Sequence, residues 1–327
     1  MAFRDAIRAA ARRTPVIGNL LDQRDSLAEL RDALLLDRDD LRRQVESWQH
    51  VHRFVPPGHF YSPLPDLAEI VRDASRLFPA DLPRTVGGID LREDAQVALL
   101  QSLLPFYAEM PFRPEAQPGL RYRFENGAFS YSDAIFLYLM LRHCRPRRVI
   151  EVGSGHSSCV TLDTSERFLG NEVKAIFIEP YPELLHSLLQ PGDADRITII
   201  PERLQDVPLD QFRSLQADDI LFIDSTHVAK IGSDVTYIFN DILPALQQGV
   251  VVHFHDIFYP FEYPRWWFDQ GRAWNEAYIL RSFLQYNAAF RVELWNHFLL
   301  TVDAPFFAEH MPLCLRNSGA SLWLRRL

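Results

Sequence analysis

Short apolar runs alternate with helical stretches from residue 147 onward. Five runs are rich in Val, Ile and Phe, as buried strands are, and they cover 149–152, 173–178, 197–200, 220–223 and 250–254. This alternation predicts a parallel β-sheet whose two faces are covered by helices. Two later β-type runs, 290–301 and 321–324, follow an aromatic, proline-rich insertion and a helical stretch at 276–286. The fold class expected for this part of the chain is therefore α/β.

The first 145 residues have a different, helical pattern. Residues 66–145 are mainly helical and end in a predicted helix at 132–143. Within residues 1–50, one apolar row recurs at heptad spacing: Leu20, Leu27, Leu34, Leu41 and Trp48. The companion row is mostly polar and consists of Gln23, Leu30, Asp37 and Gln44. Two interpretations stay open: a short coiled coil that makes a homo-oligomer, or an amphipathic helix lying on its own domain.

Three parts of the chain are expected from these changes of pattern. Residues 1–55 form a helical arm, and prolines and a glycine at 56–65 break the helix that precedes them. Residues 56–123 are then a linker and a helical cap region, and 124–327 form the α/β domain.

Composition and charge restrict the partners of this chain. It has 327 residues and a formal net charge of -9, which argues against a nucleic acid as main partner. Its 3 cysteines have no metal or redox spacing and suit a reducing cytoplasm. No apolar run approaches the roughly 18 residues of a membrane span, and the first residues lack the apolar core of a secretory signal. We therefore expect a cytoplasmic protein.

The most informative motif lies at residues 148–158, where the first apolar run ends. A strand leads into Gly153 and Gly155, and a helix is expected to open just beyond them. Such a turn lets a backbone approach a ligand closely. The dinucleotide pattern G-x-G-x-x-G fails because position 158 is Ser, and the phosphate-loop pattern fails because no Lys follows. Because Glu151 precedes the glycines, the motif favours a nucleotide-like ligand with a positive charge; a tight turn without a ligand is the alternative.

Polar side chains also follow the second and third runs. In open parallel sheets, ligands bind at the carboxyl ends of the strands. Glu179 ends the second run, 24 positions after Gly155, which is close to the spacing of an acid that accepts both ribose hydroxyls. Gln205 and Asp206 follow the third run and could read an adenine edge, although a helix cap or a turn is the alternative.

Acidic and imidazole groups follow the fourth and fifth runs. Asp224 and His227 come after the fourth run, and His255 and Asp256 after the fifth. Two neighbouring strand ends that each carry an Asp and a His favour a catalytic or metal site over helix capping. His253 shares a strand face with His255 but lies deeper, so we expect a hydrogen-bonded core histidine there.

Taken in order, these segments resemble a class I S-adenosylmethionine-dependent methyltransferase. The resemblance is closest to the bacterial group of small-molecule and sugar O-methyltransferases, covers roughly residues 124–327, and is carried by 129–134, 149–158, 177–179, 221–227 and 252–256. It implies a Rossmann-like, mostly parallel sheet whose last strand inserts antiparallel. Two positions depart from the family pattern: residue 157 is Ser where many members have Gly, and residue 225 is Ser where relatives often have Gly.

The resemblance also assigns roles in binding S-adenosylmethionine. Gly153 and Gly155 would approach the methionine part of this cofactor, Glu151 would help to hold its ammonium group, and Glu179 would take the ribose. Gln205 and Asp206 lie where the family recognises adenine, and the predicted cofactor-binding set also includes Ser154 and Asp224.

Methylation of a hydroxyl group requires a general base or a Lewis acid, because a neutral alcohol is a poor nucleophile. We expect His255 to be this base, since imidazole titrates near neutral pH, with Asp256 or Asp224 orienting it or acting instead and His227 close by. Some relatives bind Mg²⁺ through acids after the fourth and fifth strands, where this chain has Asp224 and Asp256. A third oxygen ligand is missing, and an imidazole suits a hard cation poorly.

The function expected from the sequence is methyl transfer to a sugar or another small hydroxylated metabolite. The expected acceptor is a small molecule, and a glycan is one candidate. The alternatives are a non-catalytic scaffold with a methyltransferase-like domain and a metal-dependent hydroxylase on the same fold. The insertion at 257–267 is interpreted either as a lid over the acceptor or as a packed insertion at the mouth of the sheet.

Overall fold

The computed structural model describes residues 15–51 and 54–327. The contacts within the chain divide it into two compact units, Met1–Arg72 and Asp73–Leu327. We describe each unit by itself. None of the helices in the described ranges is both long enough and apolar enough to cross a bilayer.

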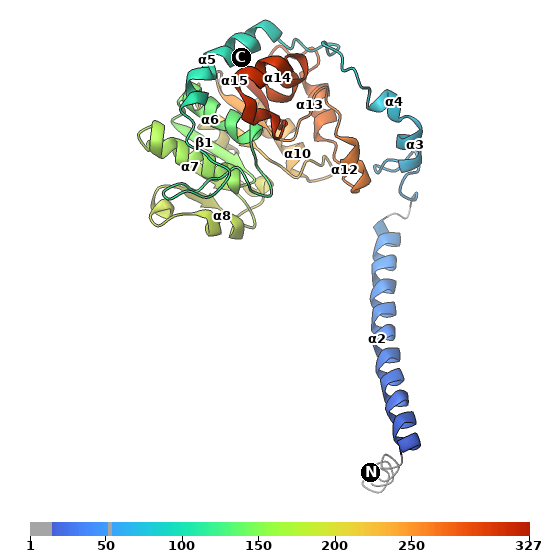
Figure 1. Ribbon diagram of the computed structural model, residues 1–327. Helices are drawn as coiled ribbons and strands as arrows, with labels where there is room; N and C mark the ends of the chain where they lie inside the picture. The colour runs from blue at the N-terminus through green and yellow to red at the C-terminus, as the bar shows by residue number, and fades with distance from the viewer. Residues whose placement is uncertain (1–14, 52–53) are drawn as a thin grey trace. The chain divides into compact units, whose positions relative to one another are not determined.

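Within the residues that the structure describes, the first unit contains one long helix and one short helix (Figure 1). Helix α2 spans Pro15–Val51, and helix α3 spans Leu67–Arg72. The 37 residues of α2 correspond to a length of about 55 Å at 1.5 Å per residue. The coiled coil expected for this arm stays a prediction, as does the three-part division of the chain.

The second unit is built on a seven-stranded sheet with the order β3-β2-β1-β4-β5-β7-β6. The strands are β1 Arg148–Val152, β2 Lys174–Ile178, β3 Thr198–Ile200, β4 Ile220–Ile223, β5 Val251–Phe254, β6 Phe290–Trp295 and β7 Leu322–Arg326. β7 pairs antiparallel with both β5 and β6, and the other pairs are parallel. The predicted fold class, a mostly parallel sheet with an antiparallel last strand, is confirmed.

One predicted strand is too long. The β-type run at 290–301 was expected to be one strand, but β6 ends at Trp295 and helix α14 follows at Asn296–Val302. The buried side chain of Asn296 explains the break, because its Oδ1 atom accepts hydrogen bonds from the backbone N–H groups of His297 and Ser321. These two hydrogen bonds turn the chain at the end of β6, and the apolar pattern of the sequence does not reveal them.

The helices form two groups around the sheet. One group contains α5 Glu93–Ala108, α6 Ser132–Cys144, α7 His156–Phe168 and α14, which pack against one another. Helices α6 and α7 lie side by side (Figure 1). The other group consists of η2 Leu204–Asp206, α9 Leu209–Arg213, α10 Asp234–Tyr237, the π-helical turn η3 Ile238–Ile242 and α11 Leu243–Ala245.

The remaining helices are short, and some of them contact the first group. They are α4 Ala74–Leu77, α8 Glu183–Leu188, η1 Asp193–Asp195, α12 Arg265–Asp269, α13 Glu276–Leu284, α15 Ala304–His310 and η4 Pro312–Leu315. The core beneath the helices is apolar: strands β4 and β5 are buried along their whole length, as parallel strands covered on both faces are.

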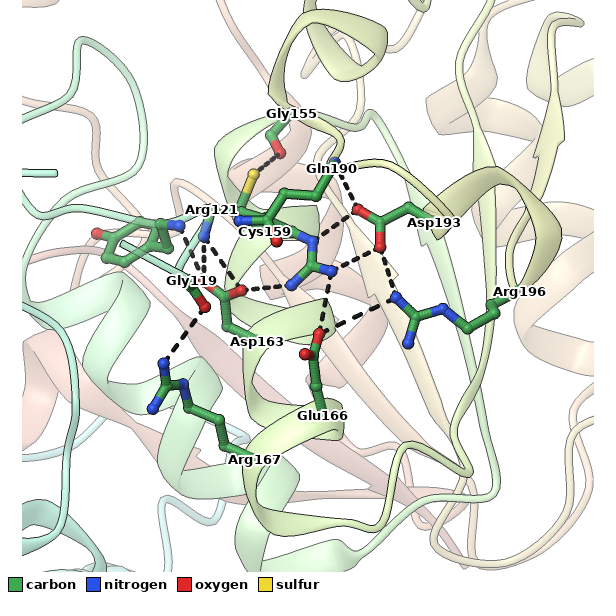
Figure 2. A network of polar contacts seen from close by, with 11 residues as sticks. Gly119, Arg121, Gly155, Cys159, Asp163, Glu166, Arg167, Gln190, Asp193 and Arg196 are labelled. Carbon is green, nitrogen blue, oxygen red and sulfur yellow. Dashed lines mark hydrogen bonds and ion pairs between the residues drawn. The ribbon is translucent and has the colours of Figure 1, made fainter. Parts of the chain in front are cut away.

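A buried ion network holds the irregular segment before α6 against the sheet domain (Figure 2). The Arg121 side chain is 2% exposed and pairs with Asp163 of α7 at 2.7 Å and with Asp193 of η1 at 2.5 Å. The carboxylate of Asp163 also accepts hydrogen bonds from the backbone N–H groups of Arg121 and Tyr122. One guanidinium thus joins three segments that are distant in sequence.

The aromatic insertion at 257–267 packs into the domain. Tyr259, Phe261, Tyr263 and Trp267 are all buried. The rings of Tyr259 and Phe261 contact Trp295 at the end of β6. Of the two interpretations of this segment, the contacts favour the packed insertion.

Candidate functional site

The turn after β1 brings the backbone of the first strand against the end of the fourth. Gly153 has a φ of +77°, and a Cβ atom placed there would lie 2.0 Å from the backbone oxygen of Asp224. Only glycine fits this position. Gly155 has a φ of 173°, which is ordinary extended backbone, and caps the start of α7. The predicted helix start is confirmed, and the turn packs closely against the end of β4.

Glu151 lies fully buried beneath this turn. Its Oε1 atom accepts hydrogen bonds from the hydroxyls of Ser157 and Ser158, at 2.6 and 2.8 Å. Its Oε2 atom is buried and has no hydrogen-bond partner among the described residues. Burial raises the pKa of Glu151 to about 8, although the two hydroxyls act in the opposite direction. A cationic ligand group that approached this buried, unpartnered oxygen would stabilise the ionised carboxylate.

A cavity of about 390 Å³ opens at the carboxyl ends of β1, β2 and β4. Its lining includes Gly153, Glu179, Gln205 and Asp224. The two carboxylate oxygens of Glu179 accept hydrogen bonds from the backbone N–H groups of Tyr181 and Ser154, at 2.9 and 3.3 Å. The strand ends named by the sequence therefore meet around one cavity.

The two residues predicted to recognise adenine differ in whether they line the cavity. Gln205 lines the cavity, and its side-chain amide donates to the carbonyl of Gly232 at 2.7 Å. Asp206 is exposed and pairs with Arg203 at 2.8 Å, and it is not part of the cavity lining. The role of both residues stays a prediction.

A cluster of carboxylates and imidazoles lies beyond Asp224. His227 donates through Nδ1 to Glu276, at 2.8 Å from Oε2, and its Nε2 atom lies 3.2 Å from Asp224 Oδ1 and 3.8 Å from Asp256 Oδ2. His255 Nε2 lies 3.5 Å from Asp256 Oδ1. The structure thus brings together all four residues predicted to be catalytic and adds a fifth, Glu276.

The backbone at this cluster is held in an uncommon conformation. His227 and Asp256 both have a φ of 59°. Such a left-handed conformation costs a residue other than glycine roughly 1–2 kcal/mol, so the surrounding fold must impose it. Asn275 and Glu276 contribute to this, because both donate their backbone N–H to the carbonyl of His227.

Comparisons with known proteins agree with this architecture. A family model described as a methyltransferase domain matches residues 150–257. An uncharacterized protein from Archaeoglobus fulgidus is 33% identical over 177 residues, which are 53% of this chain and 78% of that protein. Residues 150–257 of this chain therefore form a methyltransferase domain, with the Rossmann-like fold of class I S-adenosylmethionine-dependent methyltransferases. Residues 150–257 include the glycine turn, Glu179 and all four residues predicted to be catalytic, whereas Glu276 lies outside this stretch.

Two solved methyltransferase structures are similar in fold. The methyltransferase PaMTH1 of Podospora anserina, bound to S-adenosylhomocysteine, is 14% identical, covers 80% of this chain and 97% of its own, and gives a TM-score of 0.40. The O-methyltransferase TomG from Streptomyces achromogenes, in complex with S-adenosylmethionine, is 14% identical, covers 71% and 89%, and gives 0.41. Neither likeness bears on the substrate of this methyltransferase.

Charges in the cluster of this methyltransferase are set by close contacts. Burial acts to lower the pKa of His227, but its hydrogen bonds with Asp224 and Glu276 outweigh burial and raise the pKa to about 10. Burial also opposes protonation of His255, yet the neighbouring Asp256 and Asp224 raise its pKa above the usual 6.5. The carboxylates around both rings thus favour the protonated imidazole, and His227 is a cation at neutral pH.

The predicted metal ligands Asp224 and Asp256 face an imidazole. No three His, Cys, Asp or Glu side chains in the described part of the chain are arranged to hold a metal ion. Because carboxylates only accept hydrogen bonds, the Nε2–H group of His227 points at both carboxylates, where a cation would otherwise bind. This donor set does not fit Mg²⁺, and we derive no chemical step from a metal.

Sequence reasoning missed two residues and misjudged a third. Glu276 and Trp274, whose ring stacks on His227 at 4.3 Å, lie 49 and 47 positions away, and no motif marks them. His253 is buried against Phe222 at 4.1 Å, but neither ring nitrogen has a hydrogen-bond partner in the described structure. The expectation of a hydrogen-bonded histidine was wrong, and burial lowers the pKa of His253 well below 6.5, which keeps it neutral.

Proposed function

We propose that this protein is an S-adenosylmethionine-dependent O-methyltransferase that acts on a sugar or another small hydroxylated molecule. One observation carries the proposal: Asp224 lines the 390 Å³ cavity and also contacts His227 of the buried cluster. A cofactor in the cavity and an acceptor beside the cluster would therefore meet at this residue.

The residues around the cavity fit this cofactor. The carboxylate of Glu179 offers two acceptor oxygens to a vicinal diol, and the close turn at Gly153 leaves backbone, not side chain, at the cavity wall. The free Oε2 atom of Glu151 suits a nearby ammonium group. When bound, S-adenosylmethionine supplies an electrophilic methyl group, so the protein has to position and deprotonate the acceptor.

His255 is the proposed base. Its Nδ1 atom is buried and has no hydrogen-bond partner among the described residues, so it can accept the proton of an acceptor hydroxyl. Asp256, 3.5 Å from Nε2, stabilises the imidazolium that results. His227 is already protonated and holds Asp224 and Asp256 in place.

Calorimetry with S-adenosylhomocysteine tests the cofactor site. Glu179→Gln is expected to weaken binding by about 10- to 100-fold, because a hydrogen bond to a charged group contributes roughly 1.5–3 kcal/mol. Glu183→Gln is the matched control, since Glu183 is an exposed carboxylate on α8 outside the cavity lining. Absence of saturable binding to the unaltered protein, or equal losses in both variants, would refute the cofactor assignment.

Methyl transfer from labelled S-adenosylmethionine to a panel of monosaccharides and small alcohols tests the chemistry. His255→Asn is expected to abolish transfer while leaving the affinity for S-adenosylhomocysteine within about twofold, because His255 is not part of the cavity lining. Undiminished transfer by this variant would show that another group takes the proton.

A further inference from the structure

Helix α2 carries the same six-residue pattern in three successive heptads. The pattern is Leu-x-x-x-Arg-Asp, and its members are Leu20, Arg24 and Asp25; Leu27, Arg31 and Asp32; and Leu34, Arg38 and Asp39. The same ion pair between adjacent residues forms in each repeat: Arg31–Asp32 at 2.6 Å and Arg38–Asp39 at 2.7 Å are examples. Leu41 and Trp48 continue the apolar row.

The leucines of this row are exposed. Leu20, Leu27, Leu34 and Leu41 retain 60, 65, 58 and 60% of their accessible surface. Fully burying a leucine is worth roughly 1.5–3 kcal/mol, whereas exposed ion pairs on a helix add only about 0.3–0.5 kcal/mol each. A helix in water gains little from its own side chains, so the stability of α2 depends on what covers this row.

The spacing of the repeat distinguishes between two ways of burying the apolar row, against a globular domain or against a partner helix. A helix that lies on a globular domain needs an apolar stripe with a mean period of 3.6 residues, and no strict repeat. A repeat of seven residues drifts around a straight helix by about 20° per heptad, and it stays in one seam only when two helices supercoil. Three successive heptads with the same Leu, Arg and Asp positions therefore favour a supercoiled partner helix.

We propose that α2 forms a left-handed coiled coil with α2 of a second copy of this chain. Within each repeat the charges of the Arg and the Asp cancel, so the repeated residues of two copies have no net charge to repel one another. The Asp lies five residues after the Leu, on the far side of the helix from the apolar row. Arg24, Arg31 and Arg38 lie four residues after each leucine, beside the apolar row. Charged residues at such flanking positions influence the choice and orientation of the partner helix.

Light scattering coupled to size-exclusion chromatography of the full chain tests this proposal. We expect the unaltered protein to have twice the mass of one chain, and Leu34→Arg to have the mass of one chain. Leu36→Arg is the matched control: it makes the same change two residues away, on the opposite side of the helix, at a leucine that is 72% exposed. This variant should keep the doubled mass.

Binding of S-adenosylhomocysteine is the control for folding. Both variants should bind it as the unaltered protein does, because both substitutions lie in the first unit and the cofactor cavity lies in the second. The proposal is overturned if the unaltered chain is monomeric, as expected for a helix that lies on its own domain or awaits a different protein. It is equally overturned if Leu34→Arg and Leu36→Arg leave the same mass. The proposal does not depend on methyl transfer.

Discussion

At the scale of single residues, two positions of the site have a left-handed backbone. They are Gly153 and His227, with φ values of +77° and 59°. Only glycine fits at position 153, because the end of β4 leaves no room for a Cβ atom. At position 227, the carbonyl accepts hydrogen bonds from the backbone N–H groups of Asn275 and Glu276.

Gly153→Ala is expected to destabilise the protein by more than about 2 kcal/mol, because left-handed backbone alone costs roughly 1–2 kcal/mol and the new Cβ would displace Asp224. Gly155→Ala is the control: its backbone is extended, and its Cβ would lie 3.2 Å from a flexible Leu184 side chain. Urea unfolding measures both. A loss at Gly155 as large as that at Gly153 would contradict the steric argument.

Glu276→Gln is expected to lower the pKa of His227 from about 10, because the ring loses one of the two carboxylates that hold it protonated. NMR titration of ring-labelled histidine measures the value directly. Glu262→Gln is the control, since Glu262 bonds to Tyr278 and not to a histidine. An unchanged pKa of His227 in Glu276→Gln would mean that Asp224 alone sets its charge.

At the scale of elements, the irregular segment before α6 is held by charge as well as by packing. Arg121 pairs with Asp163 and Asp193, whose side chains are fully buried. Burial opposes ionisation of Asp193, but the hydrogen bond from Arg121 outweighs it and lowers the pKa. For Asp163 burial dominates, and its pKa is raised. One arginine therefore compensates two buried acids unequally.

Arg121→Met is expected to cost about 3–5 kcal/mol of unfolding free energy, because it leaves two buried acids without their cation. Arg167→Met, on helix α7, is the control. The Arg167 side chain is exposed and makes one long hydrogen bond, 3.3 Å, to the carbonyl of Gly119 (Figure 2). Its loss should cost less than about 1 kcal/mol. Comparable losses of unfolding free energy in the two variants, measured by urea unfolding, would show that the ion network does not stabilise the fold.

At the scale of the whole molecule, the buried titratable groups of the site link stability to pH. The folded state raises the pKa of Glu151 from 4.5 to about 8 and that of His227 from 6.5 to about 10. Both groups thus bind their proton more tightly in the folded protein. Their contribution is complete below the unfolded pKa and is lost as pH rises through the folded value.

The unfolding free energy is therefore expected to fall between pH 7 and pH 10, as Glu151 ionises and His227 loses its proton. Urea unfolding at the two pH values measures the change. Glu151→Gln should lose less stability over this interval than the unaltered protein, because a neutral amide does not titrate. Stability that rises with pH in this interval would exclude raised pKa values at both groups.

The sequence by itself determined the sheet and the places where its strands end. Buried parallel strands are continuous apolar runs, so β4 and β5 can be read directly, and ligand-facing residues such as Glu179 and Asp224 follow from the rule that sites form at carboxyl ends. Local pattern and local position were sufficient for these features, since both are properties of neighbouring residues in the chain.

Only the tertiary structure decided which groups meet and in what state of charge. Glu276 reaches His227 across 49 positions, and Asn296 ends β6 by bonding to Ser321. Whether an imidazole is a cation or neutral depends on the carboxylates around it, as the contrast between His227 and His253 shows. Such contacts are made through space, and burial amplifies them, so the order of residues along the chain does not specify them.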